Sequence, residues 1–211
     1  LLGKRIICCE GVCLGISGFA FLQASSFRQA RLELVAGWEI VKKYKAYFPF
    51  MTQILTRLIE SECGPDWTCS DRGASDSELR SHIRAAKGLS VLMPVFRAHL
   101  HRARGRGYYS LGKKSRAVRH FARANRYAEK YGIGYERARC LLDLAAVKEE
   151  GQDENRAKAI RLLKEMESVI PRAESWLLGD QYDEAVVAPE FDLEAWEREH
   201  GPVGGSEVGS A

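Results

Sequence analysis

The feature that most constrains the fold of this chain is a spacing of small and bulky residues that occurs twice. The two sets are Gly105, Tyr108, Ala117, Phe121 and Ala124, and Gly18, Phe21, Ala30, Leu34 and Gly37. Glycine and alanine let two helices approach closely, whereas large apolar residues fill the seams between successive helix pairs. The shared spacing therefore predicts antiparallel helix pairs that stack on one another.

Helical periodicity runs through most of the sequence. In the segment 115–131, apolar residues recur every three or four positions, and the arginines fall outside that stripe. This pattern is typical of an amphipathic helix. The same criterion predicts helices over 11–23, 27–43, 50–63, 77–92, 94–109, 115–131, 135–149 and 155–169. No segment alternates apolar and polar residues over the length that a strand needs, so we expect an all-α fold.

The helices divide the chain into a folded array and a tail. A third unit is marked by Ala159, Leu163, Met166 and Pro171, and the helices at 50–63 and 77–92 form a divergent unit. The polar, Gly/Pro-containing connection 64–76 is expected to be an exposed loop. We expect a repeat domain over 1–178 and an acidic, largely disordered tail over 179–211, because the Gly/Ser-rich end has little apolar surface to bury.

On this spacing the sequence resembles a tetratricopeptide-repeat (TPR) array over residues 3 to 178. The runs 117–121, 128–132 and 136–142 are similar to the helical repeats that follow large STAND-type signalling ATPases, some of which are fused to nucleotide cyclases or protein kinases. The resemblance implies a right-handed α-solenoid that binds proteins in signal transduction. It further implies a cytoplasmic, ATPase-associated regulatory part of a longer polypeptide, with no catalytic machinery of its own.

Charge is strongly segregated along the chain. The segment 79–128 contains thirteen Lys and Arg residues and no Asp or Glu, whereas 129–211 contains nineteen acidic and ten basic residues. The net charge of +4 therefore hides a basic middle and an acidic end. An acidic protein or peptide, or another domain of the same polypeptide, is the partner that this middle segment favours.

The first helix of a TPR pair lines the concave groove, so the crossing at Gly105 predicts groove residues. They are His99, Arg102, Arg106 and Tyr109. Arg102 and Arg106 are one helical turn apart, and their guanidinium groups could together hold a carboxylate or phosphate. They resemble half of the carboxylate clamp with which some TPR domains hold acidic C-terminal peptides. The corresponding positions of the first repeat, Gly15 and Phe19, do not complete such a clamp.

A second basic face is expected on the helix 115–131. Its members are Arg116, Arg119, Arg123 and Arg126. A solvated cationic surface is the plain interpretation, and nucleic acid bound along 80–126 is the alternative to an acidic protein. The acidic tail could itself lie on the basic groove, and the outer ends of the array could self-associate.

The sequence has no motif for a cofactor, a metal or a reaction. No phosphate-binding loop is present, and the histidines and cysteines lack metal-ligand spacing. The apolar stretch 6–22 follows two basic residues, as a targeting or membrane segment does, but the repeat pattern runs through it. We expect a helix of the array there and no association with a membrane.

Overall fold

The computed structural model describes residues 2–23, 26–44, 49–64, 67, 74–189 and 198. Within these residues the α-helices are α1 Leu2–Gln23, α2 Phe27–Tyr44, α3 Pro49–Cys63, α4 Asp76–Leu92, α5 Arg97–Ser110, α6 Lys114–Lys130, α7 Gly134–Val147 and α8 Gln152–Glu165. Three 3₁₀-helices accompany them: η2 Pro94–Phe96, η3 Arg172–Gln181 and η4 Glu184–Val186. The described residues contain no strand, only an isolated bridge between Ile170 and Val187. The all-helical prediction is confirmed.

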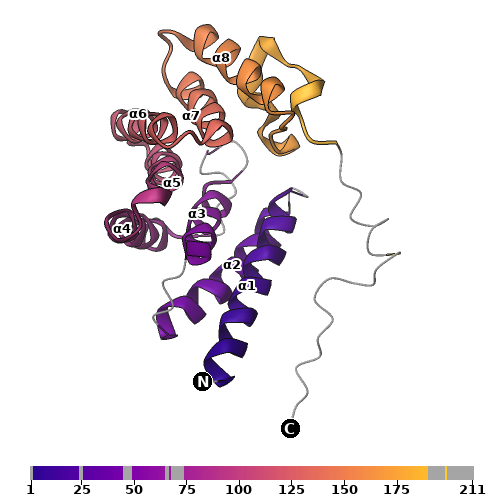
Figure 1. The fold of residues 1–211 in the computed structure, drawn as a ribbon. Helices are drawn as coiled ribbons and strands as arrows, with labels where there is room; N and C mark the ends of the chain where they lie inside the picture. Colours follow the sequence, from indigo (N-terminus) through magenta and orange to yellow (C-terminus); the bar gives the residue numbers. More distant parts are fainter. Residues whose placement is uncertain are drawn as a thin grey trace.

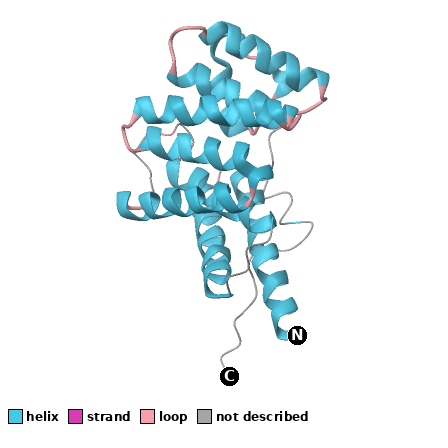
Figure 2. Ribbon diagram, turned by 60° about the vertical axis from the view of Figure 1, so that its left-hand side comes forward, coloured by secondary structure: helices cyan, strands magenta, loops and turns pink. Residues whose placement is uncertain are grey.

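The helices from α4 onward stack on one another, and α1 and α2 run at a steep angle to this stack (Figures 1 and 2). Helices α1 and α2, α5 and α6, and α7 and α8 lie side by side as pairs. The odd-numbered helices also contact one another in order, α1 with α3, α3 with α5, and α5 with α7. Helix α5 therefore contacts α3 and α7 on one side, and it also contacts its chain neighbours α4 and α6.

Local sequence signals fix several helix ends. Ser75 caps α4: its hydroxyl oxygen accepts from the Glu78 backbone N–H, and the Glu78 carboxylate accepts from the Ser75 backbone N–H. Gly112 and Gly132 follow α5 and α6 with φ of 70° and 65°, a conformation that favours glycine. These turns reverse the chain within three residues, so α5, α6 and α7 pack as neighbours.

The close helix crossings predicted from the repeated spacing are confirmed. A Cβ atom at Gly105 would overlap the ring of Phe121, which is fully buried between α5 and α6. At the matching position of the first hairpin, a Cβ at Gly18 would lie 2.5 Å from Leu34 Cγ. Both positions therefore exclude a side chain, and each glycine lets a bulky residue of the next helix fill the seam.

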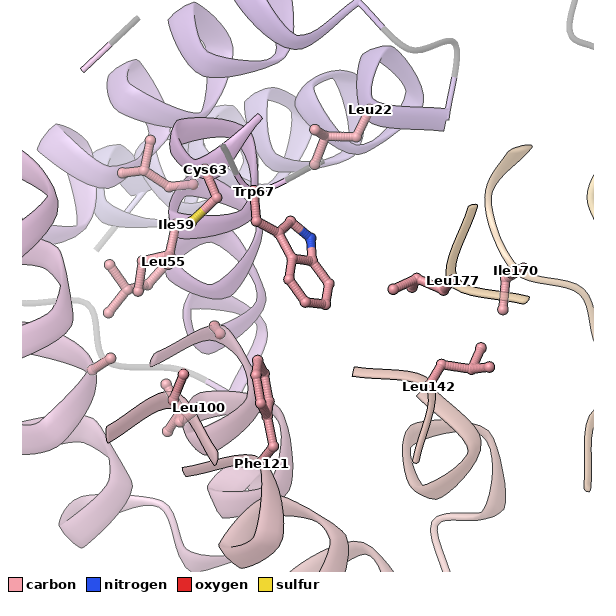
Figure 3. Close-up of a cluster of buried hydrophobic side chains, with 14 of the residues drawn as sticks. Leu22, Leu55, Ile59, Cys63, Trp67, Leu100, Phe121, Leu142, Ile170 and Leu177 are labelled. Carbon is pink, nitrogen blue, oxygen red and sulfur yellow. The ribbon is translucent and has the colours of Figure 1, made fainter. Parts of the chain in front are cut away.

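Trp67 occupies the centre of the core, between the amino-terminal and carboxy-terminal ends of the array (Figure 3). Its side chain is 2% exposed and lies edge-on to Tyr109 and Trp176, with ring centroids 5.9 and 5.1 Å away. Trp67 belongs to the segment 64–76, which the sequence predicts to be an exposed loop. At this residue the structure differs, because the large apolar indole gains more from burial than the polar loop loses. Residues 65, 66 and 68–73 lie outside the described residues.

The segment after α8 folds back on the array. Pro171 precedes η3, and Leu177, Leu178, Val186 and Val187 are buried. Ile170 pairs with this segment through its backbone N–H to Val186 O and its carbonyl to Ala188 N. The described part of the expected tail, 179–189, thus packs against the array through its apolar residues, and 190–197 and 199–211 lie outside the described residues. Among the described helices none is both long and apolar enough to span a membrane.

Candidate functional site

The inner side of α5 carries the four residues that the sequence assigns to a groove. His99, Arg102, Arg106 and Tyr109 recur every three or four residues, so they share one face, and that face meets α3 and α7. The sequence thus identified a set of residues that the fold does bring together. Their surroundings differ from those expected for an open groove, because the guanidinium groups are buried.

Arg102 is enclosed by carboxylates of two other helices. Its Nε–H donates to Glu136 Oε1 of α7 over 2.6 Å, and its Nη2 group donates to Glu60 Oε1 of α3. Asp143 lies two turns after Glu136 on α7, and its Oδ2 atom is 3.6 Å from Arg102 Nη1. His99 stands beside this group, with its Nε2 3.8 Å from Glu136 Oε2. Arg102 therefore joins α3, α5 and α7.

Arg106 makes two forked contacts with carboxylates. Its Nε–H and Nη2–H groups donate to the two oxygens of Asp143, over 3.1 and 2.8 Å. Its Nη1 and Nη2 groups also donate to the two oxygens of Glu174 in η3, over 2.6 and 3.0 Å. Arg139 Nη2 also donates to Glu174 Oε1, the oxygen that accepts from Arg106 Nη1, over 2.6 Å. The carboxylate of Glu174 thereby joins the carboxy-terminal segment to α5 and α7.

These seven residues form what we call the inner charge cluster. They are Arg102, Arg106, Arg139, Glu60, Glu136, Asp143 and Glu174. Each of the seven is buried or nearly so, and the side chain of Glu174 is 12% exposed. A buried charge is tolerated only when it is paired and hydrogen-bonded, and here the two signs face one another across helices.

The pKa shifts in the inner charge cluster depend on two opposing effects: burial disfavours an ionised carboxylate, and nearby guanidinium groups favour it. Burial disfavours ionised Glu60, but the guanidinium groups of Arg102, Arg57 and Arg139 outweigh it and hold the pKa of Glu60 well below its usual range. The pKa of Glu174 is lowered in the same way by Arg106 and Arg139, against the effect of burial. At Asp143 burial prevails over Arg106 and raises the pKa. The cluster is therefore held mainly as ion pairs.

Carboxylates of the chain itself therefore occupy the two arginines of the predicted clamp. The two forks of Arg106 and the contacts of Arg102 are occupied by carboxylates of α3, α7 and η3, which lie 34 to 68 residues away in sequence. Tyr109, expected to add contact area for a ligand, packs against Trp67, and Arg106 lies over the Trp67 ring, 4.7 Å from its centroid. Among the described residues, Arg102 and Arg106 are thus already paired with carboxylates of the chain itself, which compete with an external anion at this place.

The outer face of α6 presents the opposite situation. Arg116, Arg119, Arg123 and Arg126 are all exposed, as is Lys130 at the end of the helix. In the described part of the chain these five side chains form no ion pair with a carboxylate, whereas Glu129 between them pairs with Arg137 at 2.7 Å. We call these five cations the outer basic face. The sequence predicted the four arginines of this face. No described carboxylate compensates the charge of the five side chains.

Aromatic rings run beneath the outer basic face. Tyr108, His120, His101 and Tyr127 follow one another in a column, with consecutive ring centroids 5.1, 5.1 and 5.5 Å apart. Guanidinium groups cover the two ends: Arg116 lies 5.9 Å from the Tyr108 centroid and Arg97 lies 5.6 Å from that of Tyr127. The rings alternate between α5 and α6, so the column holds the two helices in register.

His101 and His120 at the centre of this column share a hydrogen bond between their Nδ1 atoms, 2.9 Å apart. Both side chains are buried, with 7% and 9% exposure. Burial and the positive charges of Arg104, Arg123 and Arg97 lower the pKa of His101 to about 4. Burial, Arg104, His101, Arg123 and Arg119 lower the pKa of His120 to about 3. Both rings are therefore neutral near pH 7.

Two hollows open on the outer basic face, one on each side of Arg123. The first has a volume of about 190 Å³ and is lined by Tyr108, Arg116, Arg119, His120 and Arg123. The second has a volume of about 420 Å³ and is lined by His101, Arg123, Arg126, Tyr127 and Lys130. Each hollow contains three cations, one histidine of the pair and one tyrosine of the column. An anion entering either hollow meets positive charge from several directions.

Sequence reasoning missed the acidic half of the inner cluster and the histidine pair. Glu136, Arg139 and Asp143 stand at the helical spacing of one face of α7, so a charged face within an otherwise apolar helix was a usable signal. Nothing in the sequence indicated that His101 and His120, nineteen residues apart, would meet. In the described residues no group of three His, Cys, Asp or Glu is arranged to hold a metal ion.

Comparisons of this chain with families of known proteins, with curated proteins and with solved structures each gave no match. The arrangement of its own residues therefore carries the functional proposal.

Proposed function

We propose that this chain is a TPR-like helical scaffold that binds an acidic segment of a protein through the outer basic face. The observation that carries the proposal is the uncompensated charge of Arg116, Arg119, Arg123 and Arg126 on one exposed helix face. Every buried arginine of the inner cluster is matched by carboxylates, so the fold does supply acidic partners where it needs them. It supplies none to this face within the described residues.

The packing of the helices supports the repeat part of the proposal. Helices α1 and α2 pack against α3, α3 and α4 pack against α5, and the α5–α6 hairpin packs against α7. The glycine crossings at Gly18 and Gly105 use the same spacing. Such stacks expose one helix of each hairpin over a long surface, which suits the binding of an extended partner. The acidic segment could belong to a separate protein or to another domain of the same polypeptide, as in a signalling ATPase, cyclase or kinase. The scaffold would contribute binding and regulation, without a reaction of its own.

The direct test is binding of a fluorescently labelled polyglutamate peptide, followed by anisotropy at fixed ionic strength. We expect the double reversal Arg119→Glu and Arg123→Glu to weaken binding by at least about tenfold, because two attractive contacts become repulsive. The matched control reverses Arg84 and Lys87, two exposed cations of α4 in the same basic segment.

Equal loss of affinity in both variants would contradict the proposed surface, since it would show that only net charge matters. Unfolding of each variant in urea verifies that the fold is retained. We expect both double variants to remain folded because all four side chains are exposed.

Nucleic acid is the second candidate, and one observation favours it. The outer basic face combines cations with aromatic rings, as single-strand binding surfaces do. However, the rings of His101, His120 and Tyr127 are stacked on one another, so their faces are already covered and a base cannot stack on them.

A salt titration distinguishes these partners. Binding of a single-stranded oligonucleotide would weaken with a log–log salt slope of about −0.7 for each phosphate contacted. If the oligonucleotide binds more tightly than polyglutamate at physiological salt, and Arg119 and Arg123 are required, nucleic acid replaces the acidic protein as the partner.

A further inference from the structure

The charge around the His101–His120 pair is unbalanced in a way that the fold does not explain. Arg104 is 7% exposed and lies next to both rings, and its Nε atom has no hydrogen-bond partner among the described residues. Its side chain forms a hydrogen bond with Tyr108. Within the part of the chain that the structure describes, the charges that shift the pKa values of the two histidines are all positive. A buried arginine that no described carboxylate pairs is costly, and Arg104 repels Arg123, His101 and His120, which border the hollows. An anion bound in the hollows would offset this repulsion.

The two hollows beside Arg123 are suited to such an anion. Each is lined by three cations, which exceeds the single charge of a carboxylate. A phosphoryl group on a side chain carries between about −1.5 and −2 charges and three acceptor oxygens near pH 7. Arginine forks match those oxygens geometrically, and Arg123 borders both hollows. The composition of the hollows therefore favours phosphate over carboxylate.

The protonation state of the histidine pair decides how many ring N–H donors the pair has besides the central hydrogen bond. In the neutral pair, one Nδ1–H donates to the other Nδ1, so only the accepting ring carries its hydrogen on Nε2. Uptake of one proton leaves that central hydrogen bond in place and gives the second ring an Nε2–H as well. His120 borders one hollow and His101 the other, so a bound dianion would favour this uptake.

We propose that the hollows on either side of Arg123 form a phosphoryl-binding site for a phosphorylated acidic protein segment, and that the bound dianion raises the pH at which the His101–His120 pair takes up a proton. This inference rests on the proposed function and names the group that the partner presents. The charged groups around the pair are Arg97 and Arg104 on α5, and Arg119 and Arg123 on α6. The other titratable neighbours are the stacked rings of Tyr108 and Tyr127. A dianion among the arginines offsets the repulsion that keeps both rings of the pair neutral.

The test compares two acidic peptides that differ at one position, phosphoserine in one and glutamate in the other. We expect the phosphoserine peptide to bind at least about tenfold more tightly, as its additional charge and third oxygen are used. Arg123→Gln should remove most of this preference, whereas the matched control Arg84→Gln on α4 should retain it. Both side chains are exposed, so neither substitution should unfold the chain.

A second readout follows the histidine ring protons by NMR as the pH is varied, with sulfate as a dianion whose own charge is constant. We expect sulfate to raise the pKa of His101 and His120, and acetate at the same ionic strength to leave it unchanged. Linkage requires that a tenfold preference for the protonated pair appear as a rise of about one pKa unit. Arg123→Gln should reduce the rise.

The outcomes separate the two proposals. If both peptides bind equally and Arg119→Glu with Arg123→Glu abolishes binding, the phosphoryl site is wrong and the acidic-segment function stands. If sulfate and acetate shift the histidines alike, the hollows act only as a diffuse positive field and the site is overturned. If the phosphoserine peptide binds through Arg123 and raises the pKa of both histidines, the site is supported.

Discussion

Two arginine-rich regions of this protein lie on opposite sides of α5 and have opposite surroundings. In the inner charge cluster, Arg102, Arg106 and Arg139 are buried and each meets carboxylates of other helices. On the outer basic face, the arginines of α6 are exposed and meet none in the described part of the chain. Arginine count alone therefore says little about binding. The decisive question is whether the fold supplies the counter-charge.

The inner charge cluster should be the more sensitive region by far. Arg106→Met would leave Asp143 and Glu174 buried without their main partner, so we expect a loss of about 3–5 kcal/mol in the free energy of unfolding. The measurement is urea unfolding followed by circular dichroism. Arg123→Met on the outer face serves as the control, with a change expected within about 0.5 kcal/mol. Equal effects at the two sites would abolish the distinction between the regions.

The orientation of α5 between the two regions depends on its close contact with α6. Gly105→Ala would press a Cβ into the Phe121 ring, and we expect a loss of about 1–3 kcal/mol in unfolding free energy. Gly88→Ala in α4 is the matched control, because a Cβ there has no neighbour within 4 Å. That change should be neutral or stabilising by about 0.5–1 kcal/mol. A harmless Gly105→Ala would show that α5 does not need this approach.

Acid should affect the two regions in different pH ranges. The pKa values of about 4 and 3 for His101 and His120 lie below the ordinary histidine value, so between about pH 6.5 and 4 the unfolded state binds protons that the folded state does not. Stability should therefore fall as pH falls through this range, by at most about 1.4 kcal/mol per pH unit for each histidine. The lowered pKa values of Glu60 and Glu174 mean that the ion pairs of these two carboxylates are lost only below about pH 4. Asp143, whose pKa burial raises, loses its charge at a higher pH than an ordinary aspartate.

Urea midpoints measured from pH 7.5 to 3.5 check this division. The double variant His101→Gln and His120→Gln should make the curve shallower above pH 4, where His99, whose pKa burial also lowers, still contributes. The steeper loss below pH 4 should remain. If the double variant changes nothing above pH 4, the histidines are not protected from protonation as their surroundings require.

Much of the fold could be predicted from the sequence, because helix formation and helix crossing are local. The expected helix bounds 27–43 and 77–92 differ by a residue from α2 Phe27–Tyr44 and α4 Asp76–Leu92. The crossing at Gly105 was predicted from the fixed spacing to Phe121. In contrast, nothing local to Trp67 indicates that a polar loop would place its indole in the core.

The candidate site was predicted only in part, for a physical reason. The spacing of Arg102 and Arg106 correctly places them on one helix face, but whether they are vacant depends on Asp143 and Glu174, which come from later elements. The outer arginines were predicted because exposure follows from the amphipathic pattern of one helix. The meeting of His101 with His120 depends on the register of α5 against α6, which spacing within one helix does not determine.

The most direct test of the account is NMR of the arginine Nε–H groups with and without phosphate. The structure predicts that the Nε–H groups of Arg102 and Arg106, which donate to Glu136 and Asp143, exchange slowly with water and do not respond to phosphate. Those of Arg123 and Arg126 should exchange rapidly and shift as phosphate is added. A response at Arg102 and Arg106, with none at Arg123, would contradict the assignment of the outer face as the binding surface.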